Sequence, residues 1–149
     1  MSENKQFPGC ACDTSGSVMD VVYDYNVHTV AYHHALKKEI PLEGCSAFGG
    51  QGEDLNPIDL MVMGVGSCLL IVMGKTAEAL KLDIVGAKAS VSYELVDYKI
   101  AAIDVVIRLP KKLAPEDQSK LETASKRCPV YLAIHPDVKV TVRYCWPQD

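Results

Sequence analysis

The chain has 149 residues, a formal net charge of −4 and 48% hydrophobic residues. A chain of this length and apolar content can bury one core but is short for two, so we expect a single folded domain. The acidic balance, without any basic run or basic-aromatic stripe, argues against nucleic acid as a partner.

The first seventeen residues are rich in polar, small and turn-forming types and lack the apolar stretch of a secretory signal. We expect residues 1–17 to form a flexible N-terminal arm and residues 18–149 to form the folded domain. The longest apolar run, residues 60–74, is shorter than the roughly 20 residues that span a bilayer, so no membrane partner is expected. Six cysteines without an export signal are expected to be thiols, metal ligands or redox residues of a cytoplasmic protein rather than a disulfide framework.

Two strands are expected over residues 18–25 and 28–36, where β-branched and aromatic residues mix with polar ones. Residues 44–53 are glycine-rich and predict a flexible loop. A helix is then expected to start at Asn56-Pro57, because Asn caps helices and Pro suits the first helical position, and to run to about Leu82.

This helix is apolar on every face between residues 60 and 73, so no side of that segment suits water. One small sheet cannot cover all of it. We therefore expect the helix to be buried between the sheets of two intertwined subunits, which makes the protein an obligate homodimer.

Apolar and polar residues alternate over residues 85–95, 103–109 and 138–144, which is typical of half-buried strands. A tight connection over residues 97–99 predicts that the first two of these strands form an antiparallel hairpin.

Two short helices are expected between the second and third of these strands. Pro115 suits the first position of one helix, and Pro129 ends it and starts another that reaches Ile134. The whole order predicts an α+β domain with antiparallel sheets around a long buried central helix.

Two motifs are more specific than the order of elements. Leu55-Asn-Pro-Ile-Asp-Leu60 is followed by Gly66-Ser-Cys68, and Lys126-Arg-Cys-Pro-Val130 precedes the last strand. Together, over residues 18–144, they resemble the OsmC/Ohr family (osmotically inducible protein C and organic hydroperoxide resistance), in a divergent OsmC-like branch. The resemblance implies the OsmC-like fold, an intertwined homodimer, and reduction of small-molecule organic hydroperoxides without a metal or other cofactor.

By this resemblance, Cys68 is the catalytic thiol that attacks the peroxide, and Cys128 closes a disulfide that an external dithiol reduces. Active family members also use a glutamate after the Asn-Pro pair and an arginine from the N-terminal strands. Here that glutamate position is Ile58, and no arginine precedes Arg108. Ile58 favours the alternative function, a non-catalytic dimeric module that binds a small apolar ligand or senses redox state.

The two thiols have different expected surroundings. Cys128, directly before Pro129, is expected at a helix N-terminus, which favours the reactive thiolate. Cys68 is expected to be desolvated in mid-helix and inert without help from its surroundings.

The helix around Cys68 suggests where a substrate would lie. Met61, Val65 and Val72 lie near Cys68 on the helical spacing and are expected to line an apolar pocket for the peroxide. Gly64, Gly66 and Ser67 thin the helix surface, so another helix or a substrate can come close.

The remaining cysteines raise a competing possibility, a soft metal site. Its ligands would be Cys10, Cys12, Cys45 and Cys145 with His33 or His34. Because Cys10-Ala-Cys12 lacks the Cys-x-x-Cys spacing of structural zinc sites, we expect no metal. His135 is expected in the turn before the last strand, where a role as base is conceivable.

Overall fold

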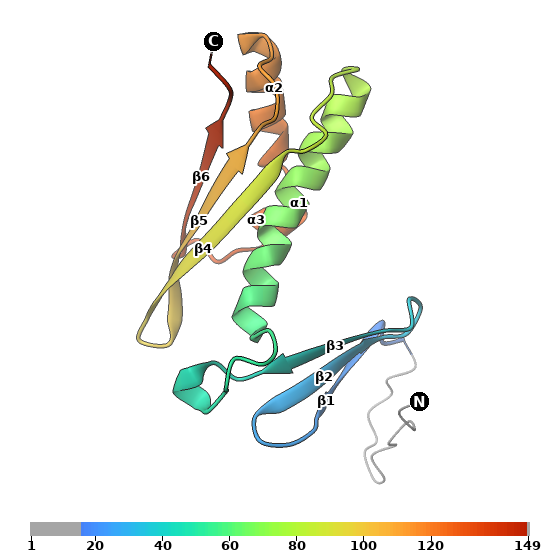
Figure 1. Cartoon of the computed structure of the whole chain (residues 1–149), viewed down its shortest axis with the longest axis vertical. Coiled ribbons are helices and arrows are strands. Elements are labelled where there is room, and N and C mark those ends of the chain that lie inside the picture. The colour runs from blue at the N-terminus through green and yellow to red at the C-terminus, as the bar shows by residue number, and fades with distance from the viewer. Residues whose placement is uncertain (1–15, 149) are drawn as a thin grey trace. The chain divides into compact units, whose positions relative to one another are not determined.

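The computed structural model describes residues 16–148. Nearly all of the expected N-terminal arm lies outside the described residues. The chain divides into two compact units, Met1–Pro57 and Ile58–Asp149, whose elements are labelled in Figure 1. The expectation of a single domain over residues 18–149 therefore stays a prediction.

The N-terminal unit contains an antiparallel sheet with strand order β1-β2-β3. β1 (Met19–Tyr23) and β2 (His28–His33) confirm the two expected strands, and β3 (Lys38–Glu43) follows, before a short 3-10 helix at Ser46–Phe48. The sequence pattern did not predict β3, because Pro41 interrupts it. Proline is tolerated there because β3 is an edge strand of this sheet.

The C-terminal unit opens with α1 (Pro57–Ala79), which begins at the expected proline. β4 (Lys88–Val96) and β5 (Lys99–Arg108) form the expected antiparallel hairpin. Asp97 and Tyr98 are the two turn residues that connect β4 to β5, and both have positive φ, at 48° and 62°. This conformation matches the right-handed twist of a two-residue hairpin.

α2 (Pro115–Ser125), α3 (Pro129–Leu132) and β6 (Lys139–Cys145) complete the unit. β6 lies beside β5, but the two strands run parallel, so the prediction of antiparallel sheets is wrong for this strand. Parallel neighbours cannot be joined by a tight turn, and the chain must cross back along the sheet. α2 and α3 form that crossover.

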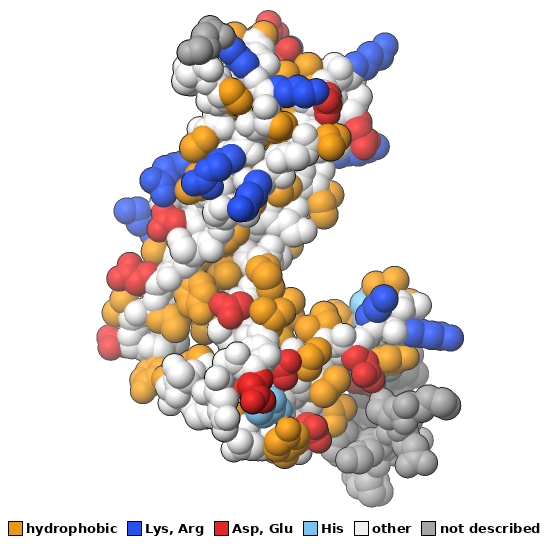
Figure 2. All heavy atoms as spheres, in the orientation of Figure 1, with side chains coloured by type: hydrophobic (Ala, Val, Ile, Leu, Met, Phe, Trp, Pro, Cys, Tyr) orange, Lys and Arg blue, Asp and Glu red, His pale blue; other side chains and the backbone are white. Residues whose placement is uncertain are grey.

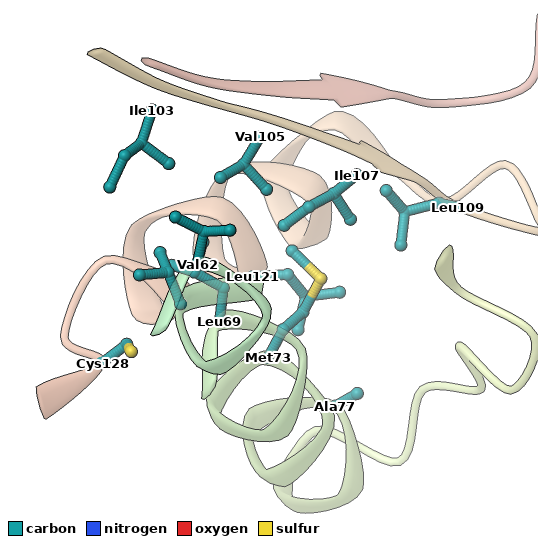
Figure 3. Close-up of a cluster of buried hydrophobic side chains, with 11 residues drawn as sticks. Val62, Leu69, Met73, Ala77, Ile103, Val105, Ile107, Leu109, Leu121 and Cys128 are labelled. Atoms are coloured by element: carbon teal, nitrogen blue, oxygen red, sulfur yellow. The ribbon is translucent and has the colours of Figure 1, made fainter. Parts of the chain in front are cut away.

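The core of the C-terminal unit lies between α1, α2 and one face of β5 (Figure 3). Each large apolar side chain that is fully buried contributes about 1.5–3 kcal/mol relative to its exposed state. The buried side chains are Val62, Val65, Leu69, Met73 and Ala77 of α1, Ile103, Val105 and Ile107 of β5, Leu109, Leu121 of α2, and Cys128.

The face of α1 opposite this core is apolar too. Ile71 is 67% exposed and Met63 is 43% exposed, which confirms that the helix is apolar on more than its buried side. By length and composition alone α1 could cross a membrane, although core helices of soluble proteins pass the same test. Among the described residues of the C-terminal unit, no element buries Ile71 or Met63.

Candidate functional site

Cys68 lies in the middle of α1, half-buried, and packs against the core cluster. The glycine two residues before it fixes how closely α1 approaches the sheet. A Cβ added to Gly66 would lie 2.6 Å from Cγ2 of Val91 in β4, whereas one added to Gly64 would meet nothing within 4 Å. The thin helix surface expected before Cys68 is therefore used for sheet packing at Gly66 and is open at Gly64.

Cys128 lies at the junction between α2 and α3, as expected. It is the N-cap residue of α3, with the extended ψ of 123° that a following proline favours. Its side chain has no exposed surface, and its sulfur accepts a hydrogen bond from the backbone N–H of Tyr131 at 3.2 Å. Cys128 lies at one end of the buried cluster (Figure 3).

Cys68 and Cys128 are both free thiols, and their side chains interact with each other. Burial raises the pKa of Cys128, and a hydrogen bond to the Cys68 side chain raises it further, while the backbone N–H groups of Tyr131 and Val130 lower it. The net effect is a raised pKa, so the expectation that Cys128 favours the thiolate is wrong. A four-residue helix supplies a weak dipole, and desolvation outweighs it.

The three expected pocket residues have different surroundings. Met61 is 40% exposed and Val72 is half-buried, but Val65 has no exposed surface and belongs to the core. Val65 therefore packs the interior and does not line an open pocket. A hollow of about 280 Å³ lies between the second half of α1 and residues 82–87, and none of the three lines it.

Ile58 occupies the first turn of α1 and packs, partly buried, against the core cluster. The neighbouring Asp59 faces the sheet, where its carboxylate accepts a hydrogen bond from the Tyr93 hydroxyl of β4 at 3.1 Å. This bond ties the start of α1 to β4. Sequence reasoning missed Tyr93 as a partner, because nothing local to residue 93 indicates it.

The other cysteines and histidines of the described residues are the candidate metal ligands. Among residues 16–148, no group of three or more His, Cys, Asp or Glu side chains is placed to hold a metal ion. His33 accepts a hydrogen bond from the backbone N–H of Leu36, and His34 pairs with Asp20 at 3.2 Å. Cys10 and Cys12 lie outside the described residues.

His135 lies in the expected turn. Its Nδ1 accepts a hydrogen bond from the backbone N–H of Asp137 at 3.2 Å. Its side chain is 69% exposed, so the turn accounts for this histidine.

Solved structures with the same fold come from several bacteria. A protein of Psychrobacter arcticus 273-4, described as a candidate osmotic stress induced and detoxification response protein, is 26% identical, with a TM-score of 0.81 over 86% of this chain and 95% of that chain. An organic hydroperoxide resistance protein of Legionella pneumophila is 16% identical, with a TM-score of 0.67 over 87% of this chain and 97% of that one. That of Bacillus subtilis is 17% identical, with a TM-score of 0.62 over 85% and 96%.

No curated protein matches the chain. The family model for OsmC-like proteins matches residues 50–143, a span that contains both cysteines of the pair and the whole of both motifs around them. The α+β architecture with two small sheets agrees with this match. The chain therefore belongs to the OsmC-like protein family.

Proposed function

We propose that the protein reduces organic hydroperoxides through a dithiol and disulfide cycle of Cys68 and Cys128. The observation that carries the proposal is the contact between these two thiols, one from α1 and one from the crossover. Structures of hydroperoxide resistance proteins share the fold. Two free thiols in contact are the minimum that a disulfide cycle needs.

The different burial of the two thiols supports different roles for them in this cycle. Cys128 has no exposed surface and keeps its proton, because its pKa is raised by burial and by the hydrogen bond to Cys68. Cys68 is only half-buried, so a peroxide from solvent reaches it first. Cys68 is therefore the attacking sulfur, and Cys128 supplies the hydrogen bond and, later, the second sulfur.

The cycle balances as follows. The Cys68 thiolate attacks the outer peroxide oxygen, the O–O bond breaks, and the alkoxide takes a proton to leave as an alcohol. Cys68 becomes a sulfenic acid. The Cys128 sulfur then attacks the Cys68 sulfur, an S–S bond forms, and water leaves. An external dithiol reduces the disulfide and is itself oxidised to a disulfide.

The side chains near Cys68 on α1 favour an apolar substrate. Met61 and Val72 neighbour Cys68 on the helical spacing, and Ile58 stands where active relatives carry a carboxylate. An alkyl or lipid hydroperoxide offers the apolar surface that such residues bind.

The decisive test is a coupled assay with an organic hydroperoxide and a dithiol reductant. Cys68→Ser is expected to abolish peroxide consumption, and Cys128→Ser to leave a sulfenic acid on Cys68 that mass spectrometry detects. Cys145→Ser is the matched control, because Cys145 is an exposed thiol on β6, and it should keep full turnover. Undiminished turnover by Cys68→Ser would end the proposal.

The uncovered face of α1 supports a homodimer as the working form. The apolar side chain of Ile71 in α1 is 67% exposed, and that of Val21 in β1 is 64% exposed. A second copy that covers α1 would remove this apolar surface from water. Free thiols in a chain of this type suit the reducing cytoplasm, where we place the protein.

Sedimentation tests the dimer. The wild type is expected to sediment as a dimer in detergent-free buffer, and Ile71→Asp to shift it toward monomer, whereas Ser92→Asp on the outer face of β4 should not. A monomeric wild type would refute the dimer. A wild type that stays soluble only in detergent would instead indicate that α1 enters a membrane.

One observation favours a second candidate function, a non-catalytic module that binds a small apolar ligand or senses redox state. Ile58 removes a carboxylate from the position that active relatives use. The same coupled assay separates the two functions when it is run beside thiol titration of Cys68. Absence of turnover together with an unreactive Cys68 would favour the binding module.

A further inference from the structure

The outer face of the sheet β4-β5-β6 carries a compact group of cations. The inner face packs against α1 and α2, so alternate residues point outward. Lys88 lies opposite Arg108, and Arg143 lies opposite Val106, the next outward residue of β5. Neighbouring strands are about 4.8 Å apart and residues along a strand about 3.3 Å apart, so these three side chains emerge within about 12 Å of one another. Figure 2 shows Lys and Arg side chains gathered over this sheet.

These three residues, Lys88, Arg108 and Arg143, are called the cationic patch below. All three are exposed, and none has an ion-pair partner among residues 16–148. Arg108 donates a hydrogen bond to the neutral Ser90 hydroxyl at 3.1 Å. The patch therefore concentrates positive charge without compensation on a chain whose net charge is −4.

We propose that the cationic patch docks an acidic surface of a partner protein. The two guanidinium groups can each donate a pair of hydrogen bonds to a carboxylate of the partner. Further along the same face, two carboxylates interrupt the positive charge. Asp104 is the outward residue two positions before Val106, and Glu94 lies opposite Ala102, with Lys139 on the other side of Ala102. A long polyanion such as nucleic acid would have to pass over these carboxylates, whereas a compact acidic patch would not.

The patch is distinct from the thiol pair. It lies on the face of the sheet away from α1, whereas Cys68 and Cys128 pack on the core side. Docking on the patch therefore does not require a functioning dithiol cycle, and its test does not depend on peroxide turnover.

Fluorescence anisotropy with a short polyglutamate peptide tests the docking. The wild type is expected to bind it, more weakly as salt is raised. A triple variant, Lys88→Glu, Arg108→Glu and Arg143→Glu, should bind about tenfold more weakly or worse. The matched control reverses the same number of charges elsewhere, through Lys37→Glu, Lys38→Glu and Lys99→Glu, and should keep most of the affinity.

A footprint on the unmutated protein locates the peptide. Cys145 is exposed and lies opposite Arg108 on the same outer face, so bound peptide should slow its alkylation several-fold. Cleavage after Arg143 releases Cys145 in the C-terminal peptide for mass spectrometry. Equal losses in the two charge variants, or unchanged alkylation at saturating peptide, would overturn the proposal. Tighter binding of a single-stranded DNA of equal charge would overturn it as well.

Discussion

The N-terminal and C-terminal units differ in the contacts that stabilise each of them internally. The C-terminal unit buries a continuous apolar cluster from α1, β5 and α2. In the described part of the N-terminal unit, only Leu42 and Glu43 are buried, and apolar side chains such as Tyr23, 66% exposed, face outward. The C-terminal unit is therefore stabilised by its own core, whereas the described part of the N-terminal unit buries one apolar side chain and one carboxylate.

Glu43 is the polar anchor of the N-terminal unit. Burial raises its pKa, but hydrogen bonds from the backbone N–H groups of Gln51, Asp54, Gly52 and Glu53 outweigh burial and lower it. The distances from the Gln51 and Asp54 nitrogens to the carboxylate are 3.1 Å and 3.2 Å. The backbone amides of the loop that leads into α1 thus surround the Glu43 carboxylate in the way that amides surround a bound anion, and the carboxylate orders the loop.

The largest expected effect separates the two units. Leu69→Ala removes a fully buried side chain and should lower the free energy of unfolding of the C-terminal unit by about 2–5 kcal/mol. Leu42→Ala should loosen the N-terminal sheet and leave β5 unaffected. Hydrogen exchange of the β2 and β5 amides in the two variants checks this. Parallel changes in both strands would show that the units unfold as one.

A smaller effect is expected where α1 meets β4. Gly66→Ala places a Cβ 2.6 Å from Val91. It should lower the free energy of unfolding by about 1–3 kcal/mol, because α1 and β4 must move apart. Gly64→Ala in the same helix meets no atom within 4 Å and should gain up to about 1 kcal/mol from helix propensity. Urea denaturation measures both, and equal effects would contradict the close packing at Gly66.

The pH dependence of the N-terminal unit should follow Glu43. Because its pKa is lowered from 4.5, the carboxylate stabilises the fold above that pH, and the stabilisation is lost as pH falls through the lowered value. Glu43→Gln should weaken the unit at neutral pH and flatten its loss of stability in acid. Glu39→Gln, on an exposed position of β3, is the control. Hydrogen exchange of β2 across this pH range is the readout, and an unchanged profile would contradict the role.

The smallest expected effect sharpens the picture of the thiol pair. Alkylation of Cys128 should be slow at mildly alkaline pH, because its raised pKa leaves little thiolate. Cys68→Ser removes one of the causes that raise this pKa and should speed the reaction a few-fold. Cys145→Ser should leave the rate of Cys128 alkylation unchanged. A Cys128 that reacts no faster in Cys68→Ser would show that burial alone protects it.

Much of the fold follows from local pattern. The Asn56-Pro57 start of α1 and the tight turn of the β4-β5 hairpin depend on residues that are neighbours in sequence, and both were predicted. The pairing of β6 with β5 is a contact between distant segments, and alternation alone carries no strand direction. β3 was missed because Pro41 argues against a strand wherever the sheet edge is unknown.

The sequence also predicted part of the candidate site. The motifs around Cys68 and Cys128 indicated the pair, which the fold brings into contact. The protonation preference of Cys128 was predicted wrongly, since burial depends on packing that the sequence does not display. Val65 was assigned to a pocket for the same reason, because helical spacing gives a residue's side of the helix but not what lies against it.

The parallel direction of β6 limits which changes of chain connection this fold can accept in evolution. Because β6 must start at the same end as β5, the polypeptide has to travel back the length of the sheet, and that return stretch is where Cys128 resides. An insertion or deletion that joined β5 and β6 by a tight turn would remove this return stretch. Cys68 would then have no second cysteine beside it. The direction of one terminal strand thus makes room for the second thiol of the site.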